Sequence, residues 1–359
     1  MKRIETLPYP VPIGSGLIEQ AGTALGPVLG RGRVFLVTDE NVARTGWAEK
    51  FRAGLGRGLL GIHRLRPGEE NKDLKQLEEL LHALIEAGVE RTDVIAALGG
   101  GTVGDLAGFA AAILKRGCGY IQIPTTLLAQ ADSAVGGKTG INLPQGKNLI
   151  GAFHRPVAVL IDPGTLGTLP ARELRAGYAE VVKYGLIGHP AFFAWCEAHG
   201  AALLAGDDEA LGHAIETSVR AKAAIVARDE RETAGHRLLL NFGHSFAHAL
   251  EAEAGFSSRL LHGEAVATGM VLAFRLSVER GLCPAEDSER VSDHLEAVGL
   301  PVRLEKAKAA RLVAHMANDK KRSDGRARLI LTRGIGEAFV DDSVTLAEIE
   351  DFLERQPGS

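Results

Sequence analysis

Short runs of apolar residues alternate with stretches of helical periodicity through the first half of the chain. Each run is apolar almost throughout rather than at every second position, and helical periodicity is expected over about residues 73–87 and again from Asp105. Strands that are apolar on both faces and joined by helices are typical of a parallel sheet covered on both sides. We expect strands at Val34–Thr38, Val94–Leu98, Tyr120–Ile123 and Val157–Ile161.

The pattern changes near residue 170, where the turn-rich sequence DPGTLGTLP ends. Beyond it strand-like runs almost disappear and amphipathic helices dominate. We expect these helices at Ala171–Leu186, Leu211–Arg231, His244–Ala254, Gly263–Arg280 and Asp287–Val298. The sequence therefore predicts an α/β domain with a mostly parallel sheet over residues 1–170, followed by an all-helical domain over residues 171–359.

Composition and charge argue against nucleic-acid and membrane partners. Of the 359 residues 45% are hydrophobic and 24% charged, and the formal net charge of −4 offers no overall basic field for a nucleic acid. Cys118, Cys196 and Cys283 are too few and too scattered for a disulfide framework and suit a reducing cytoplasm. There is no apolar signal-peptide core, and the longest apolar run, Leu106–Leu114, is too short to cross a membrane. We expect a cytoplasmic protein that acts on small molecules, with no nucleic-acid or membrane partner.

A glycine-rich turn directly follows the predicted strand Val94–Leu98. In GGGTVGD, Gly99, Gly101 and Gly104 have the spacing G-x-G-x-x-G, and an alanine-rich helix follows. Such a turn can bind an anion, because unpaired backbone N–H groups and the helix dipole face the ligand. The acidic residue usual about 20 positions further on is missing, and Asp39 is the candidate to bind a ribose in its place. The alternative is a turn that serves only tight helix–strand packing.

Histidines and a glutamate of the second half suggest a metal site. His244 and His248 are four residues apart and share a helix face, but a serine follows the first one, which excludes the HExxH pattern of metalloproteases. His262 lies further on, and Glu180 precedes them with Lys183 one turn beyond it. One carboxylate and two imidazoles form a catalytic zinc set with a position left open. Each residue alone fits a surface ion pair or a packed histidine equally well, so only the combination favours a metal.

Cations and small polar residues gather between Pro124 and Ile150, where Lys138 and Lys147 lie among glycines. We expect this segment to be a loop that exposes hydrogen-bond donors. Converging cations would suit a small substrate that carries both a phosphate and a carboxylate. Further candidates for this role are Arg116, Lys183, Lys222, Arg237, Lys320 and Lys321.

Several long motifs follow one another along the chain: PGEENK, GGGTVGDLAGF, IQIPTTLLAQADSAVGGKTGINLPQGKNLIGAF, LPARELRAGYAEVVKYGLI, LNFGHSFAHALE, HGEAVATGM and DKK. In this order, over nearly the whole chain, they resemble the 3-dehydroquinate synthase family. The VGGKTGIN and GKNLIGAF stretches set sugar-phosphate cyclases apart from the glycerol and iron-type alcohol dehydrogenases of the same fold. TVGD in place of the commoner VIGD, and NFGHSFAH in place of NLGHTFGH, change no ligand or charged group.

The resemblance implies a Rossmann-like N-terminal domain, a helical C-terminal domain, catalytic NAD and a divalent metal, usually zinc, with cobalt as a possibility. It implies a homodimer and a sugar-phosphate substrate, 3-deoxy-D-arabino-heptulosonate 7-phosphate. The reaction would comprise transient oxidation by NAD, elimination of phosphate, re-reduction and an intramolecular aldol closure to 3-dehydroquinate, in the shikimate pathway.

Residues are matched to the family's motifs by role. The metal ligands would be Glu180, His244 and His262. The catalytic group would be His248, Lys138, Asp132, Lys183 and Asn148, with His248 as the acid–base residue. NAD would be bound by Asp39, Asn41, Gly68, Glu69, Lys72, Gly101, Thr102, Val103, Gly104, Asp105, Thr125, Thr126, Lys138, Lys147, Thr165 and Thr168. Substrate would be bound by Lys147, Lys222, Arg237, Asn241, one of Lys320 and Lys321, and Arg116 of a neighbouring subunit.

Three alternatives stay open at this point. Other cyclases, such as 2-epi-5-epi-valiolone synthase or 2-deoxy-scyllo-inosose synthase, act on substrates without the carboxylate, and the many cations argue against them. A metal-dependent alcohol dehydrogenase of the same fold would release NADH in net turnover. A non-catalytic nucleotide-binding protein would not need the complete set of ligand and acid–base positions.

Overall fold

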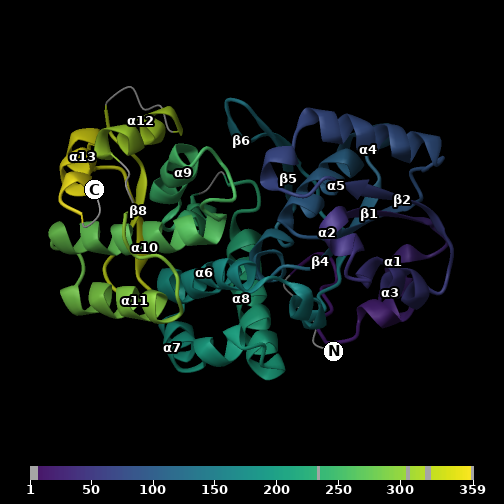
Figure 1. The fold of residues 1–359 in the computed structure, drawn as a ribbon, viewed down its shortest axis with the longest axis horizontal. Helices are drawn as coiled ribbons and strands as arrows, with labels where there is room; N and C mark the ends of the chain where they lie inside the picture. Colours follow the sequence, from purple (N-terminus) through teal and green to yellow (C-terminus); the bar gives the residue numbers. More distant parts are fainter. Residues whose placement is uncertain (1–6, 233–234, 305–307, 320–324, 357–359) are drawn as a thin grey trace. The chain divides into compact units, whose positions relative to one another are not determined.

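The computed structural model describes residues 7–232, 235–304, 308–319 and 325–356. Its contacts divide the chain into two compact units, each drawn as a ribbon in Figure 1. The first unit comprises Met1–Pro170 and Asp208–Ala227, and the second comprises Ala171–Asp207 and Arg228–Ser359. The division at residue 170 drawn from the sequence differs from this grouping, which includes Asp208–Ala227 in the first unit.

A five-stranded parallel sheet forms the centre of the first unit. Its strands lie in the order β2-β1-β3-β4-β7, and every neighbouring pair is parallel. The expected parallel α/β architecture is confirmed. The strands are β1 (Val34–Asp39), β2 (Leu59–Leu65), β3 (Val94–Gly99), β4 (Gly119–Pro124) and β7 (Ala158–Val159).

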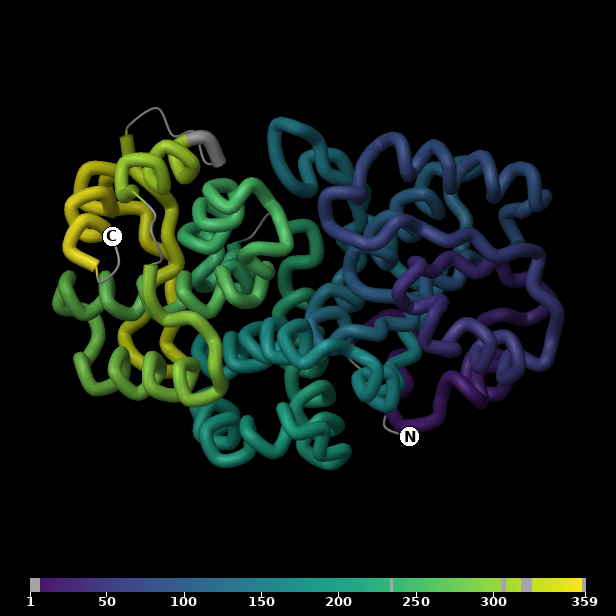
Figure 2. Tube along the Cα trace, in the orientation of Figure 1, coloured from purple at the N-terminus to yellow at the C-terminus, as the bar shows by residue number. Residues whose placement is uncertain are grey.

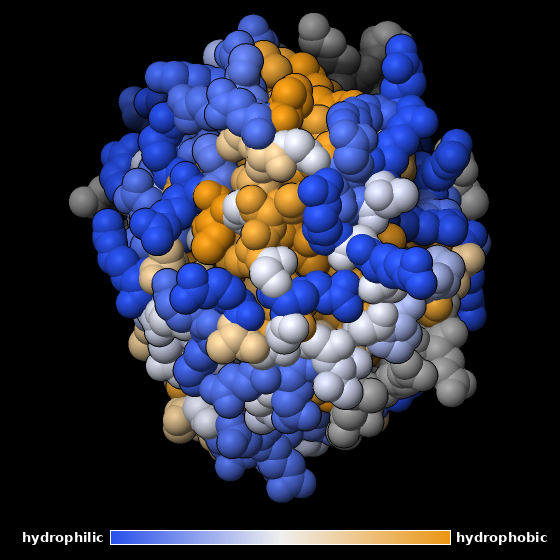
Figure 3. Space-filling model, turned by 90° about the vertical axis from the view of Figure 1, so that its right-hand side faces the viewer, coloured by the Kyte–Doolittle hydropathy of each residue, from blue (hydrophilic) through white to orange (hydrophobic). Residues whose placement is uncertain are grey.

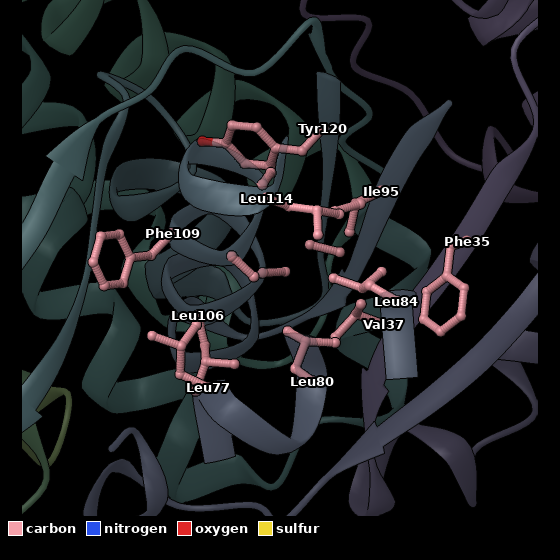
Figure 4. Close-up of a cluster of buried hydrophobic side chains, with 14 of the residues drawn as sticks. Phe35, Val37, Leu77, Leu80, Leu84, Ile95, Leu106, Phe109, Leu114 and Tyr120 are labelled. Atoms are coloured by element: carbon pink, nitrogen blue, oxygen red, sulfur yellow. The ribbon is translucent and has the colours of Figure 1, made fainter. Parts of the chain in front are cut away.

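Helices cover both faces of the sheet, as the apolar strands require. Alternate residues of each strand point to opposite faces, so Phe35 and Val37 of β1 join one buried cluster while Val34 and Leu36 join the other. The first cluster includes side chains of α4 (Leu74–Glu86) and α5 (Gly101–Ile113), and Figure 4 shows its members between helix and sheet. The second includes α1 (Ala21–Leu29) and α3 (Trp47–Leu55).

The segment expected to be a donor-rich loop contains an antiparallel hairpin instead. Its strands are β5 (Lys138–Leu143) and β6 (Gly146–Phe153), which contact α5. Gly140 lies opposite Gly151, and a Cβ on Gly151 would lie 2.1 Å from the carbonyl oxygen of Thr139. Glycines of this kind are used for close backbone approach, and they hide the strands from a search for β-branched alternation.

One long helix and several short elements complete the first unit. The long helix is α8 (Asp208–Arg228), whose last residue falls in the second unit. The short elements are α2 (Glu40–Ala43), η1 (Ile18–Gln20), η2 (Glu69–Asn71), η3 (Leu114–Arg116), η4 (Ala129–Ser133) and η5 (Pro163–Thr168). Of these, η4 is a π-helical turn, a feature often found at functional sites.

The second unit is built around the long helix α10. It packs against α9, α6, α11 and strand β8, and the tube in Figure 2 follows these segments. The helices are α6 (Ala171–Gly188), α7 (Pro190–Leu204), α9 (His244–Glu253), α10 (His262–Glu279), α11 (Ala285–Ala297), α12 (Ala309–Asp319) and α13 (Leu346–Glu354), with the short helix η6 (His236–Asn241). A two-stranded hairpin not expected from the sequence, β8 (Leu329–Thr332) and β9 (Ala338–Asp341), is added to the helices.

The surface of the first unit carries large apolar side chains that are well exposed. Ile62 on the edge strand β2, Ile85 on α4 and Ile113 on α5 are 43%, 60% and 44% exposed. Figure 3 shows an apolar area among hydrophilic side chains on one face of the molecule. Among the described residues, no helix combines the length and apolar character needed to cross a bilayer.

Candidate active site

Three side chains of the second unit converge where three helices meet. Glu180 comes from α6, His244 is the first residue of α9, and His262 is the first residue of α10. The Nε2 atoms of the two histidines lie 3.5 Å and 3.3 Å from the same Glu180 oxygen, Oε1. One ligand atom from each residue lies within 4.8 Å of the other two, which fits a shared metal ion.

Both imidazoles are oriented through their Nδ1 atoms. His244 Nδ1 lies 3.1 Å from the carbonyl oxygen of Phe242, and His262 Nδ1 lies 3.3 Å from Glu251 Oε1. An Nδ1–H donated to these acceptors leaves the lone pair on Nε2, the atom that faces Glu180. Glu251 was not identified from the sequence, because a glutamate three residues after a helical histidine resembles any solvated charge.

The electrostatics of the group follow from its burial. Burial alone would raise the pKa of Glu180, but Lys183 and the two imidazoles hold it well below its ordinary value. Burial lowers the pKa of His244, whereas at His262 it is outweighed by Glu180 and Glu251, which raise the pKa to about 10. The two carboxylates thus favour positive charge at His262, at the position where a cation would bind.

Glycines allow the ligand helices to approach closely enough. A Cβ on Gly263 would lie 1.8 Å from the carbonyl oxygen of Ala176, one turn before Glu180 on α6. A Cβ on Gly269 would lie 2.1 Å from the carbonyl oxygen of Gly243, the residue before His244. Backbone therefore meets backbone on both sides of α10.

An arginine fixes the start of α10. Arg172 of α6 donates to both carboxylate oxygens of Glu264 at 2.7 Å and to the carbonyl oxygens of Ser258 and Arg259. Glu264 in turn accepts from the N–H of Leu261 and so caps the helix that begins with His262.

The candidate nucleotide residues of the first unit lie at the carboxyl ends of neighbouring strands. β1 and β3 are paired up to Thr38 and Leu98, so Asp39 and Gly99 follow on adjacent strands. β2 and β3 flank β1 on its two sides, and the strand order reverses at this point, where parallel sheets bind ligands. Asp39 caps α2 by accepting from Val42 N, and burial raises its pKa.

The glycines after β3 have different roles, because some are required by close packing and one begins the helix that follows. A Cβ on Gly99 would lie 2.5 Å from Val103 Cγ2, and one on Gly104 would lie 2.4 Å from Gln122 Oε1. At Gly101 the nearest atom, Ser133 Oγ, would be 3.1 Å away. Gly99 and Gly104 are thus required by packing, whereas Gly101 begins α5 with more space around it.

A buried lysine connects η2, α5 and the β5–β6 hairpin. Lys72 is 3% exposed, and its Nζ lies 2.8 Å from Glu69, 2.9 Å from Asp105 and 2.8 Å from Asn148 Oδ1. Burial would lower the pKa of Lys72, but Asp105 and Glu69 outweigh it and raise the pKa above the ordinary value. Lys72 therefore remains a cation that holds three segments together.

Three further hydrogen bonds reinforce this cluster. Glu69 accepts from Thr102 Oγ1 at 2.9 Å and from Asn142 Nδ2 at 2.8 Å, and Asn142 Oδ1 accepts from the N–H of Asn148. Asn148 has a φ of +54°, which costs energy for a residue other than glycine. Asn142 was not singled out from the sequence, although it lies in a matched motif.

Candidate substrate residues lie in both units. In the first, Lys222 of α8 pairs with Asp132 of η4 and donates to its carbonyl oxygen at 2.9 Å. In the second, Arg237 is 3% exposed and donates to Asp229 and Glu230, and Asn241 donates to Glu232.

The remaining predicted residues differ in exposure. Thr165 is 1% exposed, and its hydroxyl donates to Asp162 and accepts from Gln130. Thr168 donates to Thr165 and accepts from Trp47. The exposed residues are Asn41, Gly68, Arg116, Lys138 and His248, those of intermediate exposure are Thr126 and Lys147, and Thr125 is buried. Lys320 and Lys321 lie outside the described residues.

Comparison with known proteins shows which family the chain belongs to. The models of the N-terminal and C-terminal parts of 3-dehydroquinate synthase match residues 62–176 and 177–322. A 3-dehydroquinate synthase of Zymomonas mobilis is 56% identical over 351 residues, which are 96% of this chain and 93% of the relative. The chain belongs to the 3-dehydroquinate synthase family.

Solved structures of cyclases share the fold of this 3-dehydroquinate synthase family member. A 2-epi-5-epi-valiolone synthase of Streptomyces hygroscopicus, with NAD+ and Zn2+ bound, aligns with a TM-score of 0.87 at 33% identity, covering 99% of this chain and 98% of the other. A 2-deoxy-scyllo-inosose synthase complexed with carbaglucose-6-phosphate, NAD+ and Co2+ aligns with a TM-score of 0.87 at 26% identity, covering 99% of both chains.

The close approach of α10 to α6 predicts the effect of one added methyl group. Gly263→Ala should lower the free energy of unfolding by about 1–3 kcal/mol, the usual range for overpacking, and weaken zinc binding because it displaces His262 from Glu180. Denaturant unfolding of the metal-free protein and a zinc titration measure the two effects. The control is Gly212→Ala on α8, where no atom lies within 4 Å and alanine should stabilise the helix. Unchanged stability and zinc affinity in Gly263→Ala would contradict the interpretation.

Proposed function

We propose that the chain is a 3-dehydroquinate synthase that converts 3-deoxy-D-arabino-heptulosonate 7-phosphate to 3-dehydroquinate and phosphate. The observation that carries this function is the convergence of Glu180, His244 and His262 in a chain that matches the family over residues 62–322. A carboxylate and two imidazoles suit zinc, and cobalt is the second candidate.

The chemistry needs NAD and a divalent metal ion. Residues of the first unit suit NAD, and residues of the second unit suit the metal ion. Bound NAD and a divalent ion would supply reversible hydride acceptance and Lewis acidity, respectively. The first N–H groups of α5, at Gly101, Thr102 and Val103, lack intrahelical acceptors and suit a pyrophosphate. Asp39 and Asn41 suit the ribose, and the Lys72 cluster holds Glu69 beside Thr102.

Acid–base work falls to His248. Its ring centroid lies 5.6 Å from that of His244, one helical turn away, so His248 lies beside the ligand set without belonging to the convergent group. A neutral imidazole can take a substrate hydroxyl proton and return it later. Lys183, paired with Glu180 and 1% exposed, supplies a fixed positive charge next to the ligands.

Cations and amide donors of the matched motifs would bind the charged ends of the substrate. They are Lys138, Lys147, Asn148, Lys222, Arg237 and Asn241, and the carboxylate of Asp132 pairs with Lys222. So many donors suit a substrate with a phosphate and a carboxylate, both of which form charge-assisted hydrogen bonds. A cyclase for a sugar phosphate without the carboxylate is the second candidate, because one such enzyme shares this fold at 33% identity.

The protein would act as a homodimer in the cytoplasm. An exposed edge strand, β2, and the exposed side chains Ile62, Ile85 and Ile113 offer an apolar surface for a second copy. Arg116 lies three residues after Ile113 and is exposed, which suits a cation offered to a neighbouring site. Three buried free cysteines suit a reducing compartment.

Turnover tests the function directly. Incubation with the heptulosonate phosphate, catalytic NAD and zinc should release phosphate and 3-dehydroquinate in equal amounts, with no steady accumulation of NADH. Phosphate release and product absorbance are followed together. NADH formed in proportion to product would indicate a dehydrogenase, and turnover of a sugar phosphate without the carboxylate, but not of the heptulosonate, would indicate another cyclase.

His248→Ala tests the acid–base assignment. The variant should bind zinc and NAD as the unsubstituted protein does, while kcat falls by roughly 10²–10⁴, the contribution of a general acid–base group. The control is His82→Ala, which should keep full activity. His82 also lies on a helix, and its side chain is 71% exposed. Loss of zinc would make His248 a ligand, and an unchanged kcat would leave it only a packing role.

Complementation tests whether Arg116 acts across subunits. Arg116→Ala mixed with His248→Ala should regain activity, because in each heterodimer one site keeps His248 and receives Arg116 from the other chain. His248→Ala mixed with Glu180→Ala should regain none, since both sites then lack a residue. No regain in the first mixture, with subunit exchange shown by mass spectrometry, would place Arg116 outside the neighbouring site.

A further inference from the structure

A buried carboxylate on α9 contacts the ligand set from the side away from Glu180. Glu251 is 2% exposed, and its Oε1 lies 3.3 Å from Nδ1 of His262. Burying a carboxylate is costly unless hydrogen bonds or positive charge compensate it. The groups around Glu251 should therefore explain why its carboxylate is buried.

The helix places this carboxylate on the same face as two candidate site residues. His244, His248 and Glu251 are separated by four and three positions on α9. Positions i, i+4 and i+7 lie along one stripe of a helix. α9 thus supplies one imidazole ligand and also the acceptor for the other ligand, His262, which begins a different helix.

The two imidazoles are held by acceptors of different charge. His244 Nδ1 faces a neutral backbone carbonyl, that of Phe242, whereas His262 Nδ1 faces a carboxylate. Donation to a carboxylate fixes the tautomer and the ring, and it makes the opposite nitrogen a stronger electron donor. His262 needs this more, because its side chain is 32% exposed against 12% for His244.

We propose that Glu251 is a positioning residue for the metal site, which orients His262 through Nδ1 and strengthens Nε2 as a ligand. It also places a second negative charge beside that of Glu180, which helps to balance the charge of a divalent ion and of Lys183. This inference rests on the proposed function, because it requires a metal at Glu180, His244 and His262.

Zinc affinity, measured by chelator competition, tests the role without any need for turnover. Glu251→Ala should bind zinc about 10–100-fold more weakly, the range found for such outer carboxylates, and Glu251→Gln, which keeps the shape, should fall between it and the unsubstituted protein. With cobalt in place of zinc, the visible absorption bands of Glu251→Gln should shift, since they report the ligand field rather than overall stability. Should Glu251→Ala fail to fold, the isosteric Glu251→Gln still decides the question.

Glu253 provides a matched control on the same helix. Its carboxylate pairs with Arg311 and His315 of α12, and no contact with His262 is found among the described residues. Glu253→Gln should leave zinc affinity and the cobalt spectrum unchanged. Equal weakening in Glu253→Gln, or normal affinity and spectrum in Glu251→Gln, would overturn the proposal. An unsubstituted protein that binds no zinc or cobalt would instead overturn the metal site itself, and with it the proposed function.

Discussion

The buried carboxylate of Glu180 is the constraint around which the second unit is organised. At 1% exposure it must be compensated, and a cation on its own helix, Lys183, and two imidazoles from other helices surround it. A buried ion-pair group of this kind contributes little to the stability of a protein. Removing one partner would leave an uncompensated buried charge, which lowers the free energy of unfolding by several kcal/mol. Its arrangement is better explained by the metal ion that this set of donors can hold.

The first unit applies the same principle with the sign reversed. Lys72 is a buried cation, and its partners Glu69, Asp105 and Asn148 come from η2, from α5 and from the β5–β6 hairpin. Because Asn148 adopts a positive φ, the hairpin is strained at the point where Lys72 holds it. A single ammonium group thus fixes the relative position of three segments that sequence similarity assigns to two ligands.

The sequence predicts β1, β3, β4 and the edge strand β7 of the parallel sheet, but it misses the other edge strand, β2. β1, β3 and β4 are apolar on both faces because helices cover both sides, whereas β2 carries His63 and Arg64 at the edge of the sheet and was missed. The candidate ligands Glu180, His244 and His262 could be identified because a carboxylate and two imidazoles form a rare chemical set and each lies in a matched motif. Glu251 and Asn142 could not, since their partners, His262 and Glu69, are distant in sequence and only the folded chain brings them into contact.

Glycine explains why the functional motifs are long as well as specific. In HGEAVATG, Gly263 and Gly269 admit the backbones of α6 and α9, so the motif encodes the meeting of three helices as much as the ligand His262. In GGGTVGD, Gly104 admits Gln122 of β4 while Gly101 opens the helix that follows. Tight packing and ligand binding are therefore not alternative explanations of these glycines. A helix can present its first residue to a metal ion or an anion at a fixed place only if the same helix is packed without slack against its neighbours.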